Sequence, residues 1–293
     1  QSINLGKFRI EFIKTNHSIQ DASALAIYSP AGIVVHTGDF KVDYTPVFGD
    51  AIDLQRFAEI GKKGVLALMS DSTNAERPGF TQSERTVGAT FDRLFAEHSN
   101  TRIIVATFAS NVDRVQQIIN TSYKYGRKVV VEGRSMVNII SVASELGYLN
   151  VPENTLIETD QLKNYPREKT TIITTGSQGE SMAALSRMAA DIHKKISIMP
   201  GDTIILSSNP IPGNEKAVSN IINELSEKGA NVIFQDTHVS GHACQEELKL
   251  IYSLVKPKYA IPVHGEYRHL KANAGIARML GIPKDNIFIL KSG

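Results

Sequence analysis

Cysteine is almost absent from this sequence. The chain has 293 residues and a single cysteine, Cys244, which excludes a disulfide within one chain. Such low cysteine use is typical of a reducing compartment, and we therefore expect a cytoplasmic protein. Hydrophobic residues make up 42% of the chain and charged residues 21%, which is enough apolar material for a large core. The length predicts about two domains, or one domain with a large insert.

Long apolar runs and an excess of charge are absent as well. No apolar run reaches the roughly 18 residues of a membrane-spanning helix, so we expect no membrane span. No charged segment followed by an apolar one opens the chain, so we expect no leader. The net charge of +2 is too small to indicate nucleic acid by itself, although it leaves room for a local basic groove. Gln1 directly precedes a strand pattern, and we expect a trimmed fragment.

The first part of the chain has the pattern of strands. Apolar residues alternate from Lys7 to Phe12, which predicts a strand with one apolar face. Ala24–Tyr28 and Ile33–Val35 flank a Ser-Pro-Ala-Gly segment and predict a hairpin. A further apolar run, Val65–Met69, predicts another strand.

From about residue 80 the pattern changes to alternating helices and strands. This rhythm predicts a mostly parallel sheet with helices on both of its faces. Thr81–Glu84 has the spacing of a capping box and predicts the start of a helix. The last predicted unit contains a helix over Glu246–Val255, a strand over Tyr259–Val263 and a final strand over Asn286–Leu290.

Four acidic or imidazole side chains stand at the ends of predicted strands. His17, Asp39, Asp71 and His264 each follow an apolar run and precede a turn. Loops at strand ends gather functional side chains in layered α/β folds. Imidazole and carboxylate ligands together suit Zn²⁺, or Mn²⁺ where carboxylates dominate. One such histidine is more often a core residue, but four such residues favour a metal site. His36 lies within its strand and is better interpreted as a core residue or a neighbour of the ligands.

Three further segments have features of phosphate-binding loops. Phe108–Asn111 joins a strand to a helix start, where free N–H groups and the helix dipole favour an anion. Thr175–Glu180, with Ser177 between two glycines, has a similar position, and His238–His242 places two imidazoles and a hydroxyl around a glycine. An ordinary N-cap with a tight turn is the alternative interpretation of each segment.

Two other chemistries have little support in the sequence. The glycine-rich segment lacks the lysine of a nucleotide-binding P-loop, and no G-x-S-x-G segment marks a serine hydrolase. A cysteine nucleophile, Cys244 with His242 close by, is a weak alternative.

Taken in order along the chain, these motifs resemble the β-CASP branch of the metallo-β-lactamase-fold nucleases, and within it most closely the bacterial ribonuclease J family. The segments that carry the resemblance are Thr15–Asp21, His36–Lys41, Ser70–Asn74, Phe108–Asn111, Thr175–Glu180, Pro210–Gly213, Ser240–His242 and Pro262–Arg268.

The resemblance implies an α/β protein made of the second half of the metallo-β-lactamase αββα fold with an inserted β-CASP domain. The inserted domain is expected to have a mostly parallel sheet flanked by helices. The implied boundaries are residues 1–80 for the first part of the metallo-β-lactamase domain, 81–243 for the β-CASP domain, and 244–293 for the return to the first domain.

The resemblance also implies a role for each candidate site residue. His17, Asp39 and His264 resemble metal ligands of a centre for two zinc ions, with Asp39 bridging them. Asp71 resembles an acid that orients a ligand histidine, and His242 a catalytic histidine at the scissile phosphate. The residues that match RNA- or phosphate-binding positions are Ser110, Asn111, Val112, His238, Val239, Ser240, Gly241 and His242, and Ser177 is a further candidate from its loop.

One family motif is missing. The cluster His-x-His-x-Asp-His is absent, because no two of the eight histidines are two positions apart. In the family this cluster lies upstream, so its absence fits a fragment that lacks its amino-terminal part. The three remaining ligand candidates cannot fill two zinc coordination shells. We therefore expect this chain alone to bind zinc weakly or not at all and to be inactive.

For the intact protein, the resemblance implies a zinc-dependent ribonuclease that acts on single-stranded RNA. It implies 5′→3′ exonuclease and endonuclease activity in RNA maturation and decay, and a homo-oligomer or a hetero-oligomer with a paralogue. Two alternatives remain open: an RNA-binding protein that has lost its metal site, and a metallo-hydrolase of another substrate such as a thioester.

Overall fold

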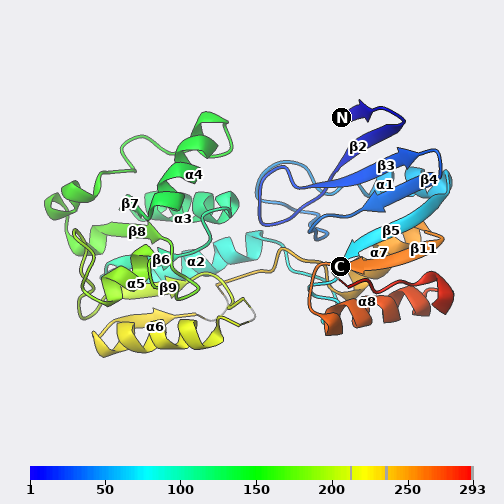
Figure 1. Cartoon of the computed structure of the whole chain (residues 1–293). Coiled ribbons are helices and arrows are strands. Elements are labelled where there is room, and N and C mark those ends of the chain that lie inside the picture. Colours follow the sequence, from blue (N-terminus) through cyan, green and yellow to red (C-terminus); the bar gives the residue numbers. More distant parts are fainter. Residues whose placement is uncertain (212, 235–236, 292–293) are drawn as a thin grey trace. The chain divides into compact units, whose positions relative to one another are not determined.

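The computed structural model describes residues 1–211, 213–234 and 237–291, so Pro212 of the Pro210–Gly213 motif lies outside the described residues. The chain forms two compact units, which are described separately (Figure 1). Unit 1 contains Gln1–Ser83 and Ser240–Gly293, and unit 2 contains Glu84–Val239.

Unit 1 is built on a six-stranded mixed sheet with the order β1-β2-β3-β4-β5-β11. Its strands β1 to β4 pair antiparallel in sequence order, and β5 pairs parallel with both β4 and β11. The strands are β1 (Ser2–Leu5), β2 (Phe8–Lys14), β3 (Ser23–Ser29), β4 (Gly32–His36), β5 (Val65–Asp71) and β11 (Tyr259–Val263).

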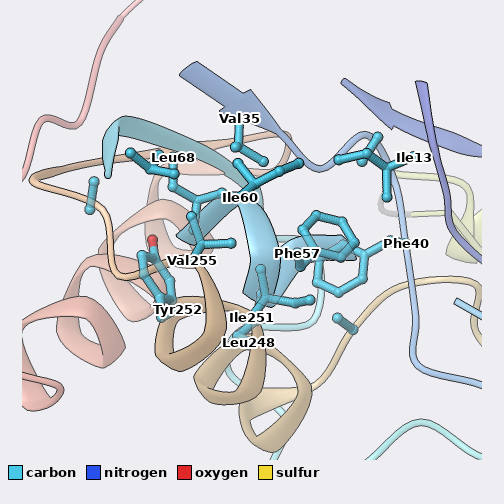
Figure 2. Packing of buried hydrophobic residues seen from close by; sticks show 14 of the residues in the cluster. Ile13, Val35, Phe40, Phe57, Ile60, Leu68, Leu248, Ile251, Tyr252 and Val255 are labelled. Carbon is cyan, nitrogen blue, oxygen red and sulfur yellow. The ribbon is translucent and has the colours of Figure 1, made fainter. Parts of the chain in front are cut away.

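Three helices accompany this sheet: α1 (Leu54–Lys62), α7 (Gln245–Val255) and α8 (Tyr267–Met279). A short 3₁₀ turn, η3, follows at Lys284–Asn286. The core lies between the sheet and the helices α1 and α7, and Figure 2 shows its side chains meeting from both sides. The strands and the loop after β4 contribute Ile13, Val35, Leu68 and Phe40, and the helices contribute Phe57, Ile60, Leu248, Ile251, Tyr252 and Val255.

Unit 2 has a five-stranded sheet with the order β10-β9-β6-β8-β7, and every pairing in it is parallel. Its strands are β6 (Ile103–Ala106), β7 (Lys128–Glu132), β8 (Thr170–Thr174), β9 (Thr203–Leu206) and β10 (Asn231–Ile233). Its helices are α2 (Arg85–Glu97), α3 (Val112–Lys124), α4 (Arg134–Glu145), α5 (Ala184–Ala189) and α6 (Glu215–Glu227), with 3₁₀ turns η1 (Thr159–Asn164) and η2 (Arg167–Lys169).

Helices cover both faces of the parallel sheet in unit 2. Ile103 and Val105 of β6 pack in one core with α2, α3 and α4, whereas Ile104 and Ala106 pack in a second core with α5 and α6. This division follows from the alternation of side chains along a strand. The predicted α/β class, with a parallel sheet flanked by helices, is therefore confirmed.

Two local predictions are wrong. The helix predicted after Thr81 exists and buries its apolar face, but it begins at Arg85 and Glu84 makes no side-chain cap. The N–H and hydroxyl of Thr81 bind instead to distant groups in unit 1. Residues 286–290 are described throughout and contain no strand, because only Ile287 pairs, in an isolated bridge to Ala260.

The two compact units do not decide where the domains of the protein begin and end. The chain crosses between the units at residues 83/84 and 239/240. The boundaries 1–80, 81–243 and 244–293 therefore stay a prediction. Among the described residues, no helix combines the length and the apolar character that crossing a membrane requires.

The strands differ strongly in how well they are shielded, and we predict that this difference appears in hydrogen exchange. All four residues of β1 are exposed at the edge of a sheet, and all four residues of β6 are buried at the centre of another. The amides of β1 should therefore exchange by local opening at a much lower free energy than those of β6. Native-state hydrogen exchange measures this difference, and equal protection of the two strands would contradict it.

Candidate metal centre

Four strands of unit 1 end at the same edge of its sheet. The strands β4, β5 and β11 are mutually parallel, and β2 has the same direction because two antiparallel steps separate it from β4. Val263 pairs with Asp71, so the last residues of β11 and β5 are level with each other. His17, Asp39, Asp71 and His264 all follow or end these strands, and the sheet gathers them at one edge.

Four side chains at this edge are close enough to share a metal ion. One ligand atom from each of Asp39, Asp71, His242 and His264 lies within 4.8 Å of the others. The Oδ2 atom of Asp39 is 3.5 Å from Nε2 of His264 and 3.9 Å from Nε2 of His17. His17 thus lies next to this group of four but outside it.

His17 is held by the loop that carries His242. Its Nδ1 atom lies 2.9 Å from the carbonyl oxygen of Gly241. Because a carbonyl oxygen only accepts, Nδ1 carries the proton, and Nε2, 3.4 Å from the hydroxyl of Ser18, keeps its lone pair. Burial lowers the pKa of His17 more than the hydrogen bond to Gly241 raises it, which keeps the ring neutral and able to act as a ligand.

Gly241 is required for this approach. A Cβ atom at residue 241 would overlap the imidazole ring of His17 and the hydroxyl of Ser18. Any larger residue must therefore move the loop or the ring, although φ of Gly241 lies outside the left-handed region.

His242 is oriented by Asp71. Its Nδ1 atom lies 2.8 Å from Oδ2 of Asp71, which is 2% exposed. Burial lowers the pKa of His242, but the hydrogen bond and the charge of Asp71 outweigh it, and the pKa is raised overall. Burial likewise raises the pKa of Asp71, while its hydrogen bonds to His242 and Thr73 give a net decrease. The pair therefore favours a carboxylate beside a protonated imidazole.

The loop of His242 is held at its backbone. The side-chain amide of Asn74 donates to the hydroxyl of Ser240 at 2.8 Å and to the carbonyl oxygen of His242 at 3.0 Å. The hydroxyl of Thr81 donates to the same carbonyl oxygen at 2.6 Å. These bonds fix the direction from which the imidazole of His242 projects.

His264 lies in a strained turn. Its φ is +56°, a left-handed value that non-glycine residues rarely adopt, and Gly265 follows with a φ of +136°. The carbonyl oxygen of His264 accepts a hydrogen bond from the N–H of Ser72 at 3.2 Å. His269, one turn further on, accepts from the N–H of Glu266 at 3.1 Å and closes the turn. Such strain is common where a fold holds a functional side chain.

The end of β5 is anchored by a buried amide. Asn273 of α8 is 0% exposed, and its Nδ2 atom donates to the carbonyl oxygen of Asp71 at 3.0 Å and to the hydroxyl of Ser72 at 2.9 Å. Its Oδ1 atom accepts from the hydroxyl of Tyr252 at 2.9 Å. The backbone of Asp71 is therefore fixed independently of its carboxylate.

These donors fit a transition metal. The edge combines two carboxylates with imidazole nitrogens. This mixture of ligands suits Zn²⁺ or Mn²⁺ better than it suits a metal ion that prefers oxygen ligands only. The group of four differs from the ligand set His17, Asp39 and His264 inferred from the sequence. It contains Asp71 and His242, which lie close to Asp39 and His264, and it leaves out His17. Which of the five side chains bind metal stays a prediction.

The predicted phosphate-binding residues of unit 2 lie at the carboxyl ends of its strands. Ser110 is exposed, but Asn111 is 2% exposed and its side chain accepts the N–H of Arg114 as the N-cap of α3. Ser177 is 2% exposed and Val112 is 7% exposed. Contacts between RNA and these buried residues would therefore have to use the backbone.

The segment before His238 is also fixed within unit 2. Arg114 is fully buried and donates from Nη1 to the carbonyl oxygens of Ser207 and Thr237 at 2.8 and 3.2 Å. His238 and Val239 follow directly in unit 2, whereas Ser240, Gly241 and His242 belong to unit 1. The predicted RNA-binding roles of these residues stay predictions.

Sequence patterns did not point to the residues that hold the site in place. Asn74, Asn273 and Glu247 bind backbone groups of the site loops through side chains that are nearly or fully buried. The spacing of Cys244 and Glu247 at a helix start was the one available signal, and it indicates only a helix cap.

Two families match the sequence. Residues 100–225 match the ribonuclease J β-CASP domain, and residues 225–284 match the Zn-dependent metallo-hydrolase RNA specificity domain. The fold and these matches define the class: a metallo-hydrolase-type protein with a β-CASP domain.

Curated relatives give the same result along the whole chain. Ribonuclease J of Synechocystis sp. is 49% identical over 100% of the chain, and Ribonuclease J 1 of Streptococcus pyogenes is 51% identical over 97%. Ribonuclease J2 of Bacillus subtilis is 45% identical over 97%. The chain therefore belongs to the ribonuclease J family and corresponds to a part of its members. It spans about half the length of these relatives, with 46%, 51% and 52% of each covered.

A solved structure has a similar fold. A crystal structure of a protein of unknown function from Enterococcus faecalis aligns with 99% of this chain and 64% of its own, with a TM-score of 0.66. The sequence identity is 19%, so this similarity concerns the fold alone.

We predict that Gly241→Ala disturbs the metal centre without unfolding the chain. The added methyl group collides with the His17 ring, so metal affinity in the full-length protein should fall about 10- to 100-fold. Isothermal titration with Zn²⁺ measures the affinity. Gly275→Ala is the control, because its Cβ meets no atom within 4 Å and an alanine in α8 should stabilise the helix by about 1 kcal/mol. Equal zinc affinities of the two variants would contradict the close contact.

Proposed function

We propose that this chain is part of a zinc-dependent ribonuclease that hydrolyses single-stranded RNA. The observation that carries the proposal is the group formed by Asp39, Asp71, His242 and His264 at one sheet edge. The chain also matches the RNA specificity domain of Zn-dependent metallo-hydrolases and has relatives named ribonuclease J, which support RNA as the substrate. The geometry of the group supports a metal, and the sequence similarities support hydrolysis and RNA.

The side chains at this edge would hold the metal from the ends of different strands. Asp39 and His264, with His17 beside them, offer a carboxylate and two imidazole nitrogens. When bound, zinc supplies an activated water and positive charge that stabilises the phosphate oxygens of an in-line displacement. The strands hold the ligands in place before any substrate binds.

His242 would act on the phosphate that is cleaved. Its Nδ1 is engaged by Asp71, so its Nε2 is directed away from that carboxylate. The raised pKa of His242 increases its protonated fraction near neutral pH, which suits a donor to a phosphate oxygen or to the leaving oxygen. Asp71 would keep the ring in this orientation.

RNA would be recognised through its backbone and its end. Ser110 precedes the start of α3, where backbone N–H groups and the helix dipole favour phosphate oxygens. The loops at Ser177 and at His238–His242 would add similar donors. We propose both 5′→3′ exonuclease and endonuclease activity, with a 5′-monophosphate end favoured in the exonuclease mode.

The intact protein would work in the cytoplasm in RNA maturation and decay, as a homo-oligomer or with a paralogue. The chain described here lacks the His-x-His-x-Asp-His cluster of the family. We therefore propose that it is inactive on its own and binds zinc weakly or not at all.

The activity is tested by comparing this chain with the full-length protein of its reading frame. We expect the full-length protein to cleave single-stranded RNA, and a chelator should abolish the cleavage. His242→Ala should lower the rate about 10²- to 10⁴-fold. The matched control is His98→Ala, at the end of α2, which should keep full activity.

Three results would go against the proposal. Cleavage that survives the chelator would rule out a metal-dependent mechanism, and tight RNA binding without cleavage would favour a non-catalytic RNA-binding protein. Hydrolysis of a thioester in place of RNA would favour the other metallo-hydrolase alternative.

Recognition of the 5′ end of the RNA is tested by the substitution Ser110→Leu in the full-length protein. The larger side chain occupies the exposed space in front of α3, so digestion of RNA with a 5′-monophosphate should fall more than internal cleavage. Ser99→Leu, at another exposed position of unit 2, is the control. Digestion rates of RNAs with 5′-monophosphate and 5′-triphosphate ends are measured in parallel. Equal loss in both modes would mean that this loop does not sense the end.

A further inference from the structure

We propose that Glu247 is a positioning residue whose buried carboxyl group holds three loops of the metal centre in register. Its role rests on the proposed metal centre, since the loops that it joins carry or support Asp39 and His242. Glu247 lies in the first turn of α7 and touches none of the candidate ligands directly.

Both carboxyl oxygens of Glu247 accept hydrogen bonds from backbone groups. Oε1 accepts from the N–H of Val42 at 2.7 Å. Oε2 accepts from the N–H of Thr81 at 2.7 Å and from the N–H of Cys244 at 2.8 Å. One side chain therefore joins three segments of unit 1 that are far apart in the sequence.

Each of these segments belongs to the metal centre. Val42 lies three residues after Asp39, and Cys244 lies two residues after His242. Thr81 connects to the same centre, because its hydroxyl donates to the carbonyl oxygen of His242 at 2.6 Å. A movement of Glu247 would therefore be transmitted to a candidate ligand on one side and to the catalytic candidate on the other.

A helix cap explains only part of this arrangement. Cys244 and Glu247 form a capping box at the start of α7, which accounts for the bond to the N–H of Cys244. Val42 and Thr81 lie 205 and 166 residues away from Glu247 in the sequence. A cap alone would leave these two N–H groups without the acceptor that the structure gives them.

Burial makes the arrangement costly unless every bond is made. Glu247 is 0% exposed, and none of the ion pairs found among the described residues includes it. A buried carboxyl group without a cation is strongly disfavoured unless hydrogen bonds replace its hydration. The three N–H groups supply this replacement, so the three loops are ordered together.

A substitution that removes one of the two acceptor oxygens of Glu247 tests this arrangement. In Glu247→Gln the side chain keeps its shape but retains one acceptor oxygen, because the amide nitrogen only donates. Either Val42 or the pair of Thr81 and Cys244 must then lose its acceptor. Glu246→Gln is the matched control: its carboxylate is 43% exposed and pairs with Lys249.

The experiment uses the full-length protein and two independent readouts. Hydrogen–deuterium exchange is followed in the peptides that contain Val42, Thr81 and Cys244, and Co²⁺ affinity is followed by visible absorption. Glu247→Gln should accelerate exchange at one or more of these amides at least tenfold and weaken Co²⁺ binding about 10- to 100-fold. Glu246→Gln should change neither.

The outcomes separate the anchor from the metal centre. Unchanged Co²⁺ affinity in Glu247→Gln would overturn the positioning role, even if exchange becomes faster. If the wild type binds no Co²⁺, the proposed metal centre fails, and the positioning role of Glu247 fails with it. Unchanged hydrogen exchange in Glu247→Gln would show that Glu247 does not hold the three loops. If Glu247→Gln does not fold, exchange in the wild type decides: the three amides must be strongly protected, and fast exchange would overturn the proposal.

Discussion

The parallel pairing of β5 with β4 and β11 is the constraint on which the candidate site depends. Parallel strands end at the same edge, so any side chain placed just after each strand meets the others there. The pairing of Val263 with Asp71 sets the level at which His264 leaves the sheet. A shift by one residue would turn every side chain of a strand to the opposite face. The buried apolar residues of β4 and β5 fix this register, and they therefore also fix where the ligands lie.

A second level of organisation comes from buried polar side chains that bind the backbone. Asn273 holds the end of β5, and Asn74 and Thr81 hold the loop of His242. Glu247 connects that loop with the one after Asp39. Such bonds fix loops that lack the regular pairing of strands, and each stabilises only when its partners are also in place. The loops of the site are therefore held by bonds within the protein itself.

The sequence predicted the parts of the fold that arise from short-range patterns. Apolar runs located the strands, and the polar residue after each run located His17, Asp39, Asp71 and His264 at strand ends. The parallel order of the strands followed from their alternation with helices.

Long-range contacts decided the features that the sequence patterns missed. Thr81 has the spacing of a capping residue, but its donors bind Glu247 and the carbonyl oxygen of His242. The run ending at Leu290 has the composition of a strand, yet it forms only one isolated β-bridge, between Ile287 and Ala260. The role of Glu247 depends on partners 166 and 205 residues away, a separation that no local pattern encodes.

Anomalous X-ray scattering at the zinc edge, from crystals of the full-length protein grown with zinc, tests directly whether zinc binds at this sheet edge. We expect a strong anomalous peak about 2.0–2.2 Å from Nε2 of His264 and from a carboxylate oxygen of Asp39. A structure in which zinc is absent from these two residues at saturating concentration, or is bound only elsewhere on the protein, would contradict it.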